Sequence, residues 1–248
     1  MSFPSYHWWR TVFFLIPAIS LYTIVLGTLS IGSSLLEKRG YFAHWCARRW
    51  SLLILRTTGV DVDVQGLERL VPGRTYVFVA NHQSIYDIPI LFWSLPFQLR
   101  IIAKESLGRF PFLGWHLRRT GHMLVNRARP ARGAIFGWAS SLTAKGLSLI
   151  VFPEGTRSRD GRVARFKGGG FLLALEAGLP IVPLSIVGSR HVMLKGRLAT
   201  YPGCVRLVVH EPIDTSALAG TDPKAFGERV RQIIAPEAES DVGVHSRT

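Results

Sequence analysis

A histidine and an aspartate stand five positions apart in the stretch NHQSIYD, residues 81–87. The stretch follows TYVFVA, an apolar run typical of a buried strand. An imidazole has a pKa near ~6.5 and can take a proton from a hydroxyl at neutral pH, while a carboxylate can fix its tautomer. His82 and Asp87 are therefore candidates for a catalytic base and its partner. A turn that caps a helix is the structural alternative.

The spacing limits how these two side chains can meet. If residues 82–87 formed one helix, five steps of about 100° would leave the side chains about 140° apart. They face each other better if His82 lies in the loop after the strand and Asp87 lies in the first turn of a helix over DIPILFWSL, residues 87–95. We therefore expect His82 to precede that helix and Asp87 to lie within it.

A second candidate stretch, FPEGTRSRDGRVARFKGGG, combines basic residues with glycines at residues 152–170. Glycine allows the backbone to approach a ligand closely and to aim N–H groups at it, so a phosphate or another oxyanion is a natural ligand. A solvated basic loop is the alternative. The spacing of a nucleotide-binding P-loop is absent, which argues against nucleotide hydrolysis.

These stretches must be positioned by the elements around them. Beyond residue 56, short apolar runs alternate with stretches of helical pattern, which predicts an α/β fold with a mixed, mostly parallel sheet flanked by helices. In such a sheet ligands gather at the carboxyl ends of the strands, where the polar stretches stand here. The expected strands are GVDVDVQG (an edge or half-exposed strand), TYVFVA, QLRIIA, HMLVN, LSLIVF, PIVPLSIVG and CVRLVVH. The expected helices are DIPILFWSL, LGRFPFLGWHLRR, ARGAIFGWASSLTAKG and GGFLLALEAG.

The amino-terminal region has the composition of a membrane-associated helical segment. Residues 11–36 contain no charge, and a helix of that length would reach about 39 Å, which exceeds the ~30 Å hydrocarbon core. Because Pro17, Gly27 and Gly32 interrupt the run, a bent or re-entrant hairpin resting in one leaflet, a true span and a buried core helix all stay open. The arginines and aromatic residues of 37–56 are typical of a helix in the headgroup zone or of an amphipathic helix packed on the domain.

Charge and length set the organisation of the chain. More basic residues follow the apolar segment than precede it, so the positive-inside bias places the main domain on the cytoplasmic side. We expect membrane-anchoring helices in residues 1–56, one α/β domain in residues 57–236 and a disordered polar tail in residues 237–248. The basic residues that follow the segment are Lys38, Arg39, Arg48, Arg49 and Arg56, and Arg10 alone precedes it.

The composition of the 248 residues limits the classes of partner that the protein is expected to bind. The net charge of +14 favours anionic partners, and the mean hydropathy of +0.22 points to a membrane surface rather than to nucleic acid, for which no recognition helix is seen. The two cysteines, Cys46 and Cys204, have no metal-ligand spacing, so neither a metal site nor a disulfide framework is expected.

Basic residues continue at two further strand ends, where Arg127 is best placed for a bidentate phosphate contact. The others are Lys104, Arg118, Arg119, Arg129 and Arg132.

Four stretches together resemble the motifs of the glycerolipid acyltransferases typified by 1-acyl-sn-glycerol-3-phosphate acyltransferases. NHQSIYD matches the pattern N-H-x-x-x-x-D and FPEGTRS matches F-P-E-G-T-R-S, which are the two most specific blocks. GHMLVNR is similar to G-x-x-[FP]-[IV]-x-R, with Leu124 where Phe or Pro is usual, and IVPLSIVGS resembles the V-P-[IVL] block. The four stand in the family's order and, with AKESLGRFPFLG, cover about residues 75–190.

This resemblance implies an enzyme that moves an acyl chain from acyl-CoA or acyl-carrier protein to the sn-2 hydroxyl of 1-acyl-sn-glycerol-3-phosphate, giving phosphatidic acid. His82 would be the base and Asp87 its orienting partner. The acceptor would be bound by Arg127, Glu154, Gly155, Thr156, Arg157 and Lys104, with the backbone around Gly155 stabilising the oxyanion. The acyl thioester is a substrate, and no cofactor or metal is implied. The expected partners are therefore membrane lipid, the lysophospholipid acceptor and the acyl donor.

Two other functions stay open on the sequence. A family member could act on another lysolipid, such as a lyso-ornithine lipid, with the same His82 and Asp87 chemistry. A basic membrane-surface binding protein without catalysis would also explain the charge and the apolar segment, but it would have no need for His82. The sequence has neither a G-x-S-x-G elbow nor a placed cysteine, so no covalent nucleophile is indicated.

Overall fold

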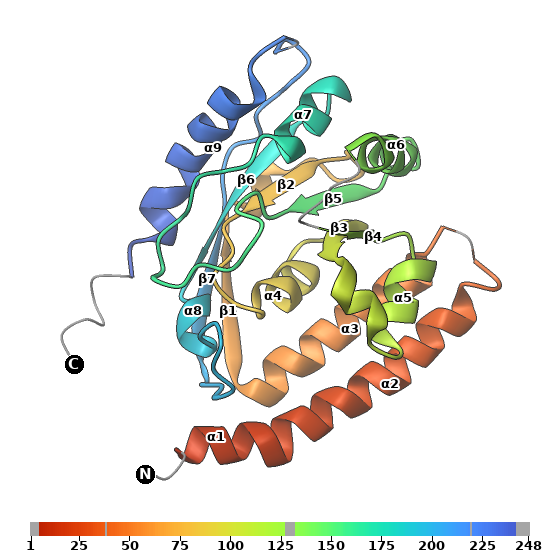
Figure 1. The fold of residues 1–248 in the computed structure, drawn as a ribbon, viewed down its shortest axis with the longest axis vertical. Helices are drawn as coiled ribbons and strands as arrows, with labels where there is room; N and C mark the ends of the chain where they lie inside the picture. The colour runs from red at the N-terminus through yellow and green to blue at the C-terminus, as the bar shows by residue number, and fades with distance from the viewer. Residues whose placement is uncertain (1–4, 38, 127–131, 219, 242–248) are drawn as a thin grey trace.

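The computed structural model describes residues 5–37, 39–126, 132–218 and 220–241. Among these residues seven strands form one sheet, in the order β1-β7-β6-β2-β5-β3-β4 (Figure 1). The strands are β1 (Val60–Gln65), β2 (Val77–Ala80), β3 (Leu99–Lys104), β4 (Met123–Val125), β5 (Ser148–Val151), β6 (Ile181–Val187) and β7 (Gly203–Val209).

The sheet is mixed and mostly parallel, as the alternation of strands and helices predicts. Only the β6–β7 pair is antiparallel among the described pairs, and β1 pairs with β7 at the edge of the sheet. The three strands β2, β5 and β3 are neighbours and run parallel. Their carboxyl ends therefore meet at one edge, which brings the loops after Ala80, Val151 and Lys104 together.

Helices cover both faces of the sheet (Figure 1). On one face lie α3 (Tyr41–Thr58) and α4 (Asp87–Ser94), and on the other lie α6 (Arg132–Thr143), α7 (Gly169–Glu176) and α9 (Pro223–Ala238). The residues of β2 alternate between the two faces: Phe78 packs in the core with α3 and α4, whereas Val77 and Val79 pack in the core with α7 and α9. Because every residue of β2 is buried, this strand reads as a continuous apolar run and is fixed firmly in the sheet.

The amino-terminal segment is one long helix rather than a broken one. It is built from α1 (Tyr6–Arg10), a π-helical turn at Thr11–Leu15 and α2 (Ile16–Ser33), which together span 28 residues. The π turn ends at Leu15, two residues before Pro17, which has no N–H to donate to the helical ladder. By length and composition this helix is able to cross a membrane, and only 6% of its most apolar stretch is buried against the rest of the chain.

The long helix nevertheless lies along the domain, beside α3 and α5 (Leu113–Arg119), rather than projecting from it (Figure 1). Arg10 donates to the carbonyl oxygens of Thr57 and Thr58 at 3.2 and 3.0 Å, near one end of the helix. Near the other end, Ser30 Oγ lies 2.6 Å from His116 Nδ1 of α5. Polar contacts at both ends therefore hold the helix parallel to the domain surface.

One expected helix is shorter than the sequence suggests. The stretch LGRFPFLGWHLRR divides into a 3-10 turn, Glu105–Arg109, and the helix α5, which begins only at Leu113. Pro111 cannot donate a helical hydrogen bond, and Phe112 adopts φ 58° and ψ −59°, outside helical geometry. At the carboxyl end, α9 includes the first residues of the expected tail and continues to Ala238, while residues 242–248 lie outside the described part of the chain.

Candidate active site

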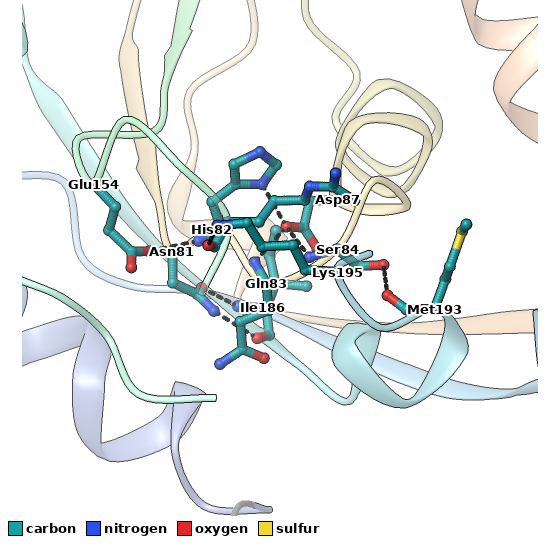
Figure 2. A network of polar contacts seen from close by, with 10 residues as sticks. Asn81, His82, Gln83, Ser84, Asp87, Glu154, Ile186, Met193 and Lys195 are labelled. Carbon is teal, nitrogen blue, oxygen red and sulfur yellow. Dashed lines mark hydrogen bonds and ion pairs between the residues drawn. The ribbon is translucent and has the colours of Figure 1, made fainter. Parts of the chain in front are cut away.

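The side chains of His82 and Asp87 meet at the carboxyl end of β2 (Figure 2). His82 lies in the loop that follows Ala80, and Asp87 is the first residue of α4, as the spacing argument requires. His82 Nδ1 lies 2.7 Å from Asp87 Oδ2. With Nδ1–H donating to the carboxylate, the ring presents Nε2 as its proton acceptor, which is the tautomer that a general base needs.

Asp87 is fully buried and is fixed by more than the histidine. The backbone N–H groups of Gln83 and Ser84 also donate to its Oδ2, at 2.8 and 2.9 Å. The carboxylate also stands in the first turn of α4, where the helix dipole favours negative charge. These contacts hold the loop and the aspartate as one unit, so the orientation of the imidazole is set before any substrate binds.

The imidazole of His82 is half enclosed by the loop that follows β5. Its ring stacks on Phe152 with a centroid distance of 4.2 Å and an interplanar angle of 27°, and its side chain is 12% exposed. The carbonyl of His82 accepts from the N–H of Ser158 at 2.8 Å. The NHQSIYD and FPEGTRS stretches, about seventy residues apart, thus form one structure around the histidine.

Glu154 joins these two loops instead of facing a substrate. Its Oε1 accepts from the His82 backbone N–H at 2.7 Å, and its Oε2 accepts from the Ala164 N–H at 3.0 Å. The residue is 4% exposed and is not among the described residues that line the cavity beside His82. Burial raises the pKa of the Glu154 carboxyl to about 7, although the two backbone hydrogen bonds act in the opposite direction. The structure therefore shows Glu154 in a positioning contact with His82, and its contact with the acceptor stays a prediction.

A cavity of about 590 Å³ opens beside His82. Its body is apolar and is lined by residues of α2, α3, α4, β3 and α5. Polar groups of Lys104, Thr156, Arg157 and Lys195 stand with His82 among the lining residues, and none of the described lining residues is acidic. The apolar lining includes Leu26, Ala47, Trp50, Ile88, Phe92, Ile101, Ala103 and Leu117.

The buried polar residues of this cavity are uncharged at neutral pH. Burial, with a smaller effect of Arg100, lowers the pKa of His116 to about 4. Burial likewise raises the pKa of the Cys46 thiol to about 11, so it is not a thiolate nucleophile. Among the described residues no group of three or more His, Cys, Asp or Glu side chains is arranged to hold a metal ion. His82 therefore remains the candidate general base of this cavity.

The structure brings together most of the predicted substrate-binding residues. Lys104, Gly155, Thr156 and Arg157 line the same cavity as His82, whereas Arg127 lies outside the described residues. Gly155 has a φ of +71°, a conformation that favours glycine, and a Cβ there would lie 2.8 Å from Lys167 Nζ. Its N–H donates to the Phe152 carbonyl at 3.0 Å, which commits this group to the turn rather than to an oxyanion.

Two residues of the site are not among the predicted site residues. Asn81 exchanges two hydrogen bonds with the backbone of Ile186, at 2.8 and 2.9 Å, and so continues the β2–β6 pairing where the β2 backbone leaves the sheet. Lys195, from the loop after α8 (Ser189–Val192), reaches the FPEGTRS turn. Both contacts join segments more than thirty residues apart, and only Asn81, which begins the first motif, carries a local signal.

Comparison with known proteins gives consistent matches. The acyltransferase family model matches residues 61–187. A 1-acyl-sn-glycerol-3-phosphate acyltransferase of Pseudomonas aeruginosa is 30% identical over 88% of this chain and 85% of its own length. A chloroplastic 1-acyl-sn-glycerol-3-phosphate acyltransferase of Brassica napus is 35% identical over 71% of this chain, and the match spans about half, 51%, of that relative.

The fold has a solved counterpart. The crystal structure of the 1-acyl-sn-glycerophosphate (LPA) acyltransferase PlsC from Thermotoga maritima matches with a TM-score of 0.73 and 29% sequence identity. The match covers 90% of this chain and 94% of that one. It thus extends well beyond the part that carries the four motifs.

Proposed function

Because the chain belongs to the acyltransferase family, we propose that it transfers an acyl chain from a thioester to the sn-2 hydroxyl of 1-acyl-sn-glycerol-3-phosphate, giving phosphatidic acid. The observation that carries the proposal is the Asp87-bound imidazole of His82 beside an apolar cavity lined also by Lys104 and Arg157. This arrangement suits a substrate pair with one long apolar chain and one phosphate. The matched proteins of Pseudomonas and Thermotoga carry this activity in their names, which supports the same assignment here.

The reaction needs no covalent enzyme intermediate. His82 Nε2 takes the proton of the acceptor hydroxyl as its oxygen attacks the thioester carbonyl. The tetrahedral oxyanion then collapses, the new C–O ester bond is kept and the C–S bond breaks. The departing thiolate takes the proton from the imidazolium, which returns His82 to its neutral state. Asp87 stabilises the imidazolium between these two proton transfers.

The cavity divides the substrates by their chemistry. The apolar body between α2, α3 and β3 holds the acyl chain of the donor, since burying methylene groups is favourable by roughly 0.8 kcal/mol each. Lys104, Thr156 and Arg157 bind the glycerol phosphate of the acceptor, because an ammonium and a guanidinium both form strong charge-assisted hydrogen bonds with phosphate oxygens. Arg127 stays a predicted second phosphate ligand. The thioester, as acyl-CoA or acyl-carrier protein, is a substrate, and the proposed reaction needs no cofactor.

The long amino-terminal helix lies in one leaflet of a membrane under this proposal. A spanning helix would leave the domain at one end, whereas this helix is hydrogen-bonded to the domain near both ends. Its outer side exposes large apolar residues, among them Phe13, Phe14, Leu21 and Val25. Arginines of α3 follow it and are suited to anionic lipid head groups, and the cytoplasmic side predicted for the catalytic domain is kept as part of this proposal.

The proposal is tested by incubating the purified protein, in detergent or lipid, with a panel of lysolipids and labelled acyl thioesters beside a His82→Ala variant. The panel holds 1-acyl-sn-glycerol-3-phosphate, a lyso-ornithine lipid and a neutral monoacylglycerol, each with acyl-CoA and acyl-carrier protein. We expect phosphatidic acid as the main product. A preference for the lyso-ornithine lipid would assign the chain to another acceptor, and folded protein that acylates nothing would refute the enzymatic function.

A further inference from the structure

The loop after α8 sends one basic side chain back into the active site. Lys195 Nζ donates to Thr156 Oγ1 at 2.9 Å and to the carbonyl oxygen of Arg157 at 2.7 Å. Its side chain is partly buried and lines the cavity together with His82. Figure 2 shows Lys195 beside the loop that carries His82 and Ser84.

The same loop also contacts the segment that carries the proposed base. Ser84 Oγ donates to the Met193 carbonyl at 2.9 Å, two residues before Lys195 (Figure 2). Residues 193–195 therefore bind both halves of the site, the NHQSIYD loop through Met193 and the FPEGTRS turn through Lys195. This double attachment fixes the position of the Lys195 ammonium relative to His82.

The hydrogen bonds of Lys195 leave ligand-binding capacity at this turn. The Thr156 hydroxyl accepts from Lys195, so its own O–H remains able to donate to a ligand oxygen. An ammonium has three N–H donors, and the two contacts with Thr156 and Arg157 use two of them. The third donor, the hydroxyl and the guanidinium of Arg157 are then three groups suited to one anionic ligand.

The charge around this turn selects among lysolipid head groups. The described lining of the cavity carries the cations Lys104, Arg157 and Lys195 and no carboxylate. A phosphate monoester, close to a dianion at neutral pH, is complementary to such a set. An amine-bearing head group would meet no acidic partner there, and a neutral head group would leave the three cations uncompensated.

We propose that Lys195 is a specificity-determining residue that binds the phosphate monoester of the acceptor together with Thr156 and Arg157, which it also holds in place. The inference rests on the proposed acyl transfer. It states that a side chain outside the two specific motifs determines which class of acceptor the protein uses. With this role, Lys195 favours a phosphate-bearing acceptor over a lyso-ornithine lipid or a neutral acylglycerol. Lys195 acts on binding, so its removal raises KM more than it lowers kcat.

The experiment compares Lys195→Gln, Lys195→Ala and Lys195→Arg with the wild type in the full chain. Steady-state kcat and KM are measured with 1-acyl-sn-glycerol-3-phosphate and with the matching 1-acylglycerol, which lacks the phosphate. The inhibition constant of glycerol 3-phosphate is measured in parallel as a probe of the phosphate site. Lys145→Gln, at an exposed turn after α6, is the matched control for losing one positive charge, and thermal unfolding checks that each variant is folded.

We expect Lys195→Gln and Lys195→Ala to raise both the KM for the phosphate acceptor and the inhibition constant about tenfold or more. Lys195→Arg should recover most of the loss, the 1-acylglycerol rate should change little, and Lys145→Gln should match the wild type. If the wild type does not use 1-acylglycerol, the inhibition constant decides the question alone.

An unchanged KM and inhibition constant in folded Lys195→Gln would overturn the inference. The inference would also be overturned if the substitution lowered kcat/KM by the same factor for both acceptors, since equal losses indicate a structural role only. A wild-type protein that acylates no acceptor would instead refute the proposed function. The two failures are therefore distinguishable.

Discussion

His82 Nδ1 lies 2.7 Å from Asp87 Oδ2, although the two residues belong to different elements, the loop after β2 and the first turn of α4. The same carboxylate oxygen accepts two backbone N–H groups of that loop. These contacts hold the loop, the imidazole and the carboxylate as one unit, and His82 also lines the cavity.

Replacing Asp87 with Asn should lower kcat about 10²–10⁴-fold with a small change in KM. The amide keeps the shape of the carboxylate but carries no charge to stabilise the imidazolium. Steady-state kinetics with 1-acyl-sn-glycerol-3-phosphate checks this expectation. A kcat within about threefold of the wild type would show that Asp87 only shapes the loop.

Glu154→Gln should flatten the dependence of stability on pH. The pKa of Glu154 is raised to about 7 in the folded protein from a model-peptide value of 4.5, so between these values the folded state binds more protons than the unfolded state. The wild type therefore loses stability as pH rises through this window, by about 3 kcal/mol at most from this group. Urea unfolding from pH 4.5 to 8 measures the difference between the two proteins, in which the other titrating groups cancel. Parallel curves for the two proteins would mean that Glu154 ionises normally.

Gly155→Ala should destabilise the protein by about 1–3 kcal/mol and lower kcat as well. The residue has a φ of +71°, a backbone conformation that strains any L side chain, and the added Cβ would also displace Lys167 Nζ beside the turn. Gly178→Ala is the matched control, because Gly178 has a φ of +60° with open space around it and lies away from the cavity. Urea unfolding and kcat are measured for both variants. Equal kcat values in the two variants would indicate that the turn geometry does not matter for the reaction.

Ala47→Phe should shift donor preference toward shorter acyl chains. Ala47 belongs to α3 and lines the apolar part of the cavity, so a phenyl ring there takes up space that methylene groups would fill. The ratio of kcat/KM over a series of saturated acyl thioesters of increasing length measures the shift. Leu53→Phe adds aromatic bulk on the same helix outside the cavity and should leave the profile unchanged. An unaltered profile in Ala47→Phe would place the acyl chain elsewhere.

Much of the fold follows from local sequence pattern. Buried strands such as Val77–Ala80 and the helix at Asp87–Ser94 have patterns set by neighbouring residues, and the expected loop position of His82 is confirmed. Contacts between distant segments are not predictable from local sequence pattern. Nothing near Glu154 shows that its carboxylate binds the backbone of His82, and nothing near Lys195 shows that it reaches Thr156, because both contacts depend on how distant loops meet.

The amino-terminal segment illustrates the same limit. Its apolar composition fits a span, a leaflet-bound helix or a core helix equally, since all three bury the same residue types. The contacts that support the leaflet-bound arrangement, from Arg10 to Thr58 and from Ser30 to His116, join it to residues far along the chain. The cavity between this segment and the sheet is likewise a product of packing. It has no local sequence signal.

The initial rate of phosphatidic acid formation by folded His82→Ala protein, compared with the wild type at saturating 1-acyl-sn-glycerol-3-phosphate and acyl donor, tests the role of His82 most directly. If His82 accepts the hydroxyl proton, we expect the rate to fall about 10³-fold or more, with membrane binding and thermal unfolding unchanged. A His82→Ala variant that forms phosphatidic acid at the wild-type rate would contradict that role.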